Sequence, residues 1–105
     1  MIICVRGANS VAFEDRHNFR AFKVVVEMAN ADLDGVRAAL ATLATLPERE
    51  TAWVAADALR RWPDVRNDAA WQQGFDAMIE KARPYGWIDE AAGTIKAHVE
   101  WPARA

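Results

Sequence analysis

Residues 20–28 read RAFKVVVEM and contain the clearest strand signal in the chain. Three consecutive valines favour an extended backbone, because branching at Cβ restricts their side chains in a helix and suits a pleated sheet. The side chains of a strand alternate between its two faces. One face would carry Phe22, Val24, Val26 and Met28, and the opposite face Ala21, Lys23, Val25 and Glu27.

Two further segments, one near each end of the chain, also predict strands. Residues 2–7 read IICVRG and are apolar on both faces except at Arg6, a pattern typical of a strand in the middle of a sheet. Residues 94–101 read TIKAHVEW and alternate with a period of two. Their inward set would be Ile95, Ala97, Val99 and Trp101, and their outward set Thr94, Lys96, His98 and Glu100.

A helix is predicted over residues 33–46, where leucine and valine recur at helical spacing. Asn30 and Asp32 precede this segment and are good candidates for its N-cap. Pro47 would end the helix, because proline cannot continue the backbone hydrogen-bond pattern.

A second helix is predicted over residues 69–83, with Gly86 suited to the left-handed position beyond its end. Between the two helices, residues 51–62 admit two interpretations: a short helical stripe, or a fourth strand over residues 51–54. Residues 8–19 read as a polar connection, of a length that is uncommon in compact domains and often functional.

These elements follow the order β-β-α-α-α-β. The chain has 105 residues, of which 52% are hydrophobic and 27% are charged, and its formal net charge is -2. A chain of this length and composition is expected to form one domain, residues 1–105, around one core. We predict an α+β fold: a small antiparallel or mixed sheet of three to four strands, covered on one face by two to three helices.

Several classes of function lack their sequence signals. The single cysteine, Cys4, excludes an internal disulfide, and no zinc-type Cys/His spacing occurs. There is no glycine-rich phosphate loop, nucleophile elbow or His-Glu helix motif, so no cofactor is expected. No basic face supports nucleic-acid binding, and no apolar stretch suggests a membrane span or a signal peptide. We therefore expect a cytoplasmic protein.

The outward faces of the predicted strands concentrate ionisable groups. They carry Lys23 and Glu27 in one strand and Lys96, His98 and Glu100 in another. This set could bind an anion, or His98 could transfer protons with Glu100 or Glu27 holding its ring. The alternative is a solvated face, on which each opposed Lys–Glu pair adds only about 0.2–1 kcal/mol.

Arg6 would lie between those two strands if the first strand is central. The polar segment 14–18 (EDRHN) lies between Phe13 and Phe19. It could close over the sheet face, with Arg16 binding a carboxylate or phosphate and His17 acting as acid or base; alternatively it is an exposed turn.

A metal site could be drawn from His98, Glu100, His17 and Asp15, although the sequence shows no metal-binding spacing. Of the five tryptophans, Trp71 and Trp101 lie on apolar stripes and are expected in the core. The remaining three lie near element ends, where such rings commonly line pockets or interfaces: Trp53, Trp62 and Trp87.

Two hypotheses on function follow. The first is a binding or interaction module, expected to form a homo-oligomer, whose polar sheet face binds a small anionic or aromatic ligand through Arg6, Arg16, Trp53 and Trp87. The second is a cofactor-free enzyme of lyase or isomerase type, with catalytic residues drawn from His98, Glu100, Glu27, Lys23 and His17. The sequence favours the module, because no catalytic constellation in it is specific.

Overall fold

The computed structural model describes residues 1–7, 10–28 and 32–102. Its strands are β1 (Ile2–Gly7), β2 (Ser10–Glu14), β3 (Lys23–Val26), β4 (Ala44–Glu48), β5 (Thr51–Ala55), β6 (Ile88–Asp89) and β7 (Thr94–Glu100). Its helices are α1 (Leu33–Leu40), α2 (Ala56–Arg60) and α3 (Ala69–Ala82), and α3 continues into the short 3₁₀ turn η1 (Arg83–Tyr85). None of these helices has the length and hydropathy to span a membrane.

The strands form one mixed sheet in the order β2-β1-β3-β7-β5-β4. The three strands β1, β3 and β7 run parallel to one another, whereas β2, β4 and β5 are antiparallel to their neighbours. The two-residue strand β6 pairs with the first part of β7. The predicted α+β class with a mixed sheet is confirmed, but the described residues form seven strands rather than three or four.

The register confirms that the polar faces of two predicted strands share one side of the sheet. Lys23 of β3 lies opposite His98 of β7, and Val25 lies opposite Glu100. The expected place of Arg6 is wrong, because β3 stands between β1 and β7. Two long parallel crossovers therefore decide the order of the strands, which alternation within each strand cannot reveal.

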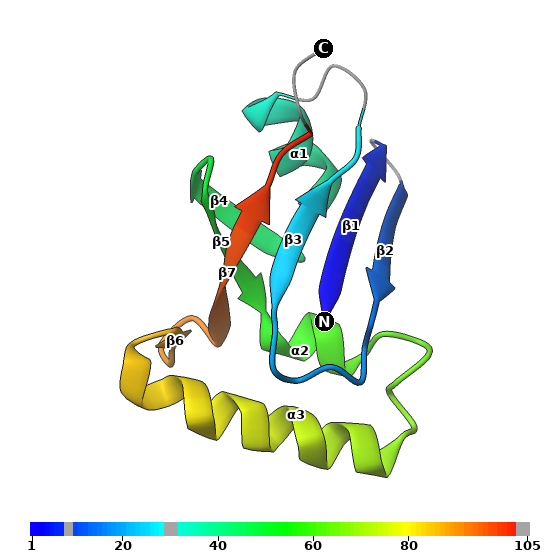
Figure 1. Ribbon diagram of the computed structural model, residues 1–105, viewed down its shortest axis with the longest axis vertical. Coiled ribbons are helices and arrows are strands. Elements are labelled where there is room, and N and C mark those ends of the chain that lie inside the picture. The colour runs from blue at the N-terminus through cyan, green and yellow to red at the C-terminus, as the bar shows by residue number, and fades with distance from the viewer. Residues whose placement is uncertain (8–9, 29–31, 103–105) are drawn as a thin grey trace.

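The sheet is curled (Figure 1), and the buried hydrophobic residues form one core cluster. Helix α1 contacts β4 at one end of the strand order and both β1 and β2 at the other. Helix α3 crosses the lower end of the sheet in this view, where its buried Trp71 and Phe75 stack at a centroid distance of 4.8 Å. Trp71 also meets the buried Phe13 of β2 edge to face. Thus α3 closes one end of the core.

The predicted helix 33–46 is too long. Helix α1 begins with the Asp32 carboxylate accepting a hydrogen bond from the Gly35 amide at 2.6 Å, and it ends at Leu40. Pro47 lies within β4 instead of ending a helix. Because β4 is at the edge of the sheet, it tolerates a residue that cannot donate a hydrogen bond, and its pairing with β5 is irregular there.

The remaining differences concern short elements. Both interpretations of residues 51–62 are partly right, since strand β5 runs directly into helix α2. The expected connection 8–19 contains the strand β2, which pairs with β1. Helix α3 closely matches its prediction, with Gly86 in the left-handed region at φ 75°. The candidate cap Asn30 lies outside the described residues.

Candidate functional site

Most charged residues of the polar sheet face form ion pairs, and Lys23 and Glu100 make up one of them. The Lys23 ammonium contacts both carboxylate oxygens of Glu100, at 3.1 and 3.3 Å. The exposed fractions of the two side chains are 36% and 44%. A half-exposed pair of this kind contributes little to stability, roughly 0–1 kcal/mol.

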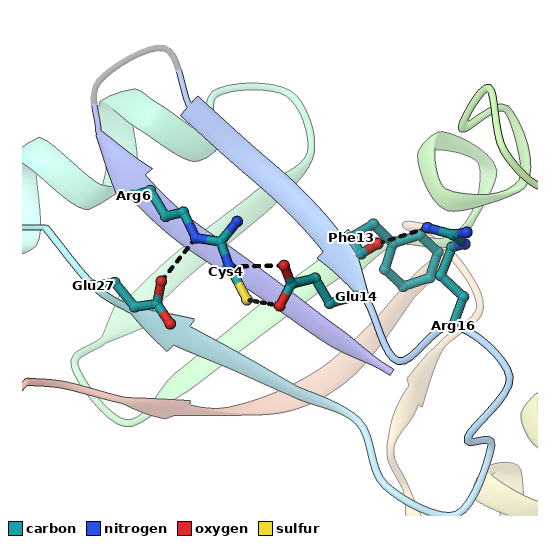
Figure 2. A network of polar contacts seen from close by, with 6 residues as sticks. All are labelled: Cys4, Arg6, Phe13, Glu14, Arg16 and Glu27. Carbon is teal, nitrogen blue, oxygen red and sulfur yellow. Dashed lines mark hydrogen bonds and ion pairs between the residues drawn. The ribbon is translucent and has the colours of Figure 1, made fainter.

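A second cluster is centred on Arg6 (Figure 2). Its Nε donates to Glu27 Oε2 at 2.8 Å, and its Nη2 donates to Glu14 Oε2 at 2.7 Å. The hydrogen bond from Arg6 lowers the pKa of the Glu14 carboxyl below its usual range. The bonds to Glu27 and Glu14 raise the pKa of the guanidinium. Arg6 thus bridges β2 and β3, the strands on either side of β1.

Cys4 belongs to the same cluster. Its Sγ is directed at Glu14 Oε1 at 3.5 Å, and the residue is 2% exposed. Burial, followed by the hydrogen bond to Glu14, raises the pKa of the thiol. A thiol that is buried and held protonated is a poor nucleophile.

These pairings leave His98 without its expected carboxylate partner. Glu100 bonds to Lys23 and Glu27 bonds to Arg6, and within the described ranges no side-chain hydrogen bond joins His98 to either. The metal site drawn from the two histidines with Asp15 and Glu100 is not formed, because no three potential ligands gather anywhere in the described chain.

Arg16 is directed away from the sheet face. Its Nη1 donates to the Phe13 carbonyl at 3.2 Å and lies 3.3 Å from the Asp64 carboxylate. The Trp71 indole N–H in turn donates to the Arg16 carbonyl at 2.9 Å. Arg16 therefore anchors the chain after β2 to the region around α3.

A groove of about 1290 Å³ lies beside β7, and we term it the α3–β7 groove. The groove arises because the pairing of β3 with β7 begins only at Lys23. The preceding residues 17–22 lie outside the sheet, on the side of α3, and form the first wall of the groove. Helix α3 forms its second wall, and the segment from η1 into the β6–β7 hairpin forms the third. Its lining residues are His17, Asn18, Phe19, Arg20, Phe22, Glu50, Thr51, Gly74, Ala77, Met78, Lys81, Ala82, Pro84, Tyr85, Trp87, Ile95, Lys96, Ala97 and His98.

The charged residues of the α3–β7 groove are mostly cationic. Arg20, Lys81 and Lys96 line it, against the single carboxylate of Glu50. In the part of the chain that the structure describes, none of these four side chains forms an ion pair, whereas the sheet-face charges described above are paired. On a chain of net charge -2, this excess of free cations makes the groove a favourable place for an anion.

The groove also holds two exposed aromatic rings. Tyr85 is 69% exposed and Trp87 is 46% exposed, and they are the two exposed large hydrophobic residues of the described chain. Their rings stack on each other with centroids 4.7 Å apart and an interplanar angle of 21°. The expectation that Trp87 lies near an element end is met, since it stands between η1 and β6.

Of the candidate site residues, the structure brings together His17, His98 and Trp87 in this groove. The ion-paired residues Glu100, Lys23, Glu27 and Arg6 lie on the sheet but do not line it. Trp53 lies opposite Lys96 in the β5–β7 ladder, on the same sheet face and also outside the groove.

Sequence reasoning missed Arg20, Lys81 and Tyr85 as candidate site residues. Arg20 lies in the segment predicted as a strand, and Lys81 lies in the helix predicted over residues 69–83. The PYGW stretch at 84–87 could have indicated the aromatic wall, because proline and glycine around two aromatic rings typically place them in an exposed turn.

Comparison of the chain with protein-family models, with curated proteins and with solved structures found no significant match.

Proposed function

We propose that this chain is a small-molecule binding protein whose ligand is an organic anion with an apolar body. The ligand occupies the α3–β7 groove. The observation that carries the proposal is the combination, in one concavity, of apolar side chains such as Phe22 and Met78 with three cations that form no ion pair within the described ranges. Ligand sites typically combine a largely apolar wall with a few polar groups that fix orientation.

The volume of the groove supports an organic ligand over a simple inorganic ion. At about 1290 Å³ it exceeds the roughly 300–1,000 Å³ of common ligand pockets, although part of it is open to solvent. Contacts with apolar walls would supply affinity that a half-exposed lysine alone does not provide, because exposed charge pairs contribute little.

The test is calorimetric titration with a panel of organic carboxylates and phosphates at low salt. We expect binding that weakens as salt is added, because the cations are exposed and their attraction is screened. The double variant Lys81→Gln/Lys96→Gln should lose about five- to tenfold in affinity. The matched control is Arg61→Gln/Arg66→Gln, which removes two exposed cations that form no ion pair with any described residue and do not line the groove.

Absence of binding across the panel would contradict the proposal. So would equal losses of affinity in the lysine variant and in the arginine control, because binding would then follow net charge alone.

A second candidate is the lyase or isomerase hypothesis, which is favoured by the presence of both histidines in the same groove. In this version His98 and His17 exchange protons with the bound anion, while Glu100, Glu27 and Lys23 keep their ion pairs. Following the panel compounds by NMR over time distinguishes the two candidates. Turnover that is lost in His98→Gln and His17→Gln, with binding retained, would favour the enzyme; unchanged compounds would favour the binding protein.

We propose separately that copies of this chain associate with one another. The outer edges of β2 and β4 have no partner strand in the described chain, and exposed edges often pair with a second copy. Light scattering of the wild-type chain tests this, and a monomer at all concentrations would contradict it.

A further inference from the structure

The Tyr85–Trp87 pair is held in place from both sides. Arg83, at the start of η1, forms ion pairs with Glu80 of α3 and with Glu90 of the β6–β7 turn. Gly86 takes a left-handed conformation between the two aromatic residues. The Lys96 amide donates to the Trp87 carbonyl at 2.8 Å, which fastens the end of the segment to β7. The stacked rings therefore sit on an anchored turn.

Two cationic residues that line the groove are connected to this pair along the chain. Lys81 lies one helical turn before Tyr85 along α3 and η1. Lys96 is joined to Trp87 through the backbone hydrogen bond just described. Both lysines line the groove together with the rings. One wall of the groove therefore combines two stacked aromatic rings with two cationic side chains.

From this arrangement we infer that the ligand carries a planar aromatic ring, which stacks on the Tyr85–Trp87 pair and places its anionic group beside Lys81 and Lys96. This inference rests on the proposed function and names the class of ligand. Rings that are already parallel present a flat face, and aromatic groups prefer offset stacking on such a face. Charge complementarity favours an anion among planar ligands, because Arg20, Lys81 and Lys96 outnumber the single lining carboxylate of Glu50.

The experiment compares two anions of equal charge, one with a planar aromatic ring system and one with a saturated ring system. Naphthalene-2-carboxylate is planar, whereas decahydronaphthalene-2-carboxylate has the same charge and a similar size but no aromatic ring. Calorimetry should give tighter binding of the planar anion by about three- to tenfold, the equivalent of one stacking contact. A second pair, adenosine 5′-monophosphate and ribose 5-phosphate, repeats the comparison with a phosphate as the anionic group. Tighter binding of the second pair than of the first would indicate a phosphate ligand instead of a carboxylate ligand.

The variants Trp87→Leu and Tyr85→Leu keep apolar bulk and remove one ring each. Each should reduce the preference for the planar anion while leaving the affinity for the saturated anion within about twofold. Trp101→Leu is the matched control, since Trp101 is a partly buried tryptophan outside the groove whose indole donates to the Arg49 carbonyl. Circular dichroism checks that all variants fold.

The outcomes separate the two proposals. Equal binding of the planar and saturated anions would overturn this inference and leave the proposed function standing. Failure of every anion to bind would overturn both. A change of oligomeric state in Trp87→Leu, seen by light scattering, would also overturn the inference, because the rings would then belong to a contact between copies of the chain.

Discussion

The ring of Phe19 lies directly against the α-carbon of Gly74. A Cβ added to Gly74 would come within 2.5 Å of Phe19 Cε2 and 2.8 Å of Cζ, which is closer than such atoms approach. Phe19 belongs to the segment 17–22 that forms one wall of the α3–β7 groove, and Gly74 belongs to the α3 wall. The absence of a side chain at Gly74 therefore allows the two walls to meet.

The first prediction concerns this contact. Glycine within a helix costs about 1 kcal/mol relative to alanine, so Gly74→Ala would stabilise α3 if nothing obstructed the new methyl group. We expect no such gain in the wild-type background, because Phe19 must move and segment 17–22 loosens. In a Phe19→Ala background the same substitution should stabilise the protein by about 1 kcal/mol.

Chemical denaturation of the four chains in this double-mutant cycle provides the measurement. A gain of the same size in both backgrounds would show that Phe19 does not constrain position 74. Anion binding should weaken in Gly74→Ala, because one wall of the groove is displaced.

The second prediction is slow modification of Cys4. Its thiol is 2% exposed and its pKa is raised, first by burial and then by Glu14. Labelling by a thiol reagent at pH 8 should be much slower in the folded protein than in denaturant. Rapid labelling of the folded chain would contradict the buried position.

The same pKa shift predicts a loss of stability at alkaline pH. The folded state keeps its proton above the ordinary thiol pKa of 9.0, whereas the unfolded state loses it. Between the two pKa values the unfolded state binds fewer protons, so the free energy of unfolding falls as pH rises above about 9. Cys4→Ala should lack this part of the pH dependence. If the free energies of unfolding of wild type and variant change in parallel from pH 8 to 11, the pKa of Cys4 is not raised in the folded state.

The third prediction concerns acid pH and the Arg6 cluster. Arg6 lowers the pKa of Glu14 below its ordinary value of 4.5. The stabilisation that the Arg6–Glu14 contact provides is fully present above pH 4.5. It is lost as the pH falls through the pKa of Glu14 in the folded state, because Glu14 of the unfolded chain takes up its proton first. Glu14→Gln should therefore show a weaker decline in unfolding free energy below about pH 4.5. Glu48→Gln, a change at an exposed carboxylate of β4, is the comparison.

The fourth prediction is that the Lys23–Glu100 ion pair contributes little to stability. Its side chains are 36% and 44% exposed, so solvent screens their attraction. A double-mutant cycle with Lys23→Met and Glu100→Gln should give a coupling free energy below about 1 kcal/mol. A markedly larger value would mean that the two charges are more strongly desolvated than their exposure indicates.

The local pattern of apolar and polar residues predicted each strand or helix whose conformation is favoured by its own residues. The valines at 24–26, the alternation from Thr94 to Glu100 and the apolar stripe of α3 all correctly predicted their elements. Pattern failed at β4 and β2, which are edge strands with one neighbour each. Such short segments owe their extended form to pairing with β5 and β1, and their own residues hold a weak signal.

By itself, then, the sequence determined the α+β class, the polar side of the sheet and the residues available to it, because side-chain alternation follows directly from backbone geometry. Tertiary structure alone decided the strand order, the pairing of Glu100 and Glu27 with lysine and arginine instead of His98, and the groove between α3 and β7. These features depend on contacts between residues far apart in the chain, such as Lys23 with Glu100 and Phe19 with Gly74. No local pattern encodes them.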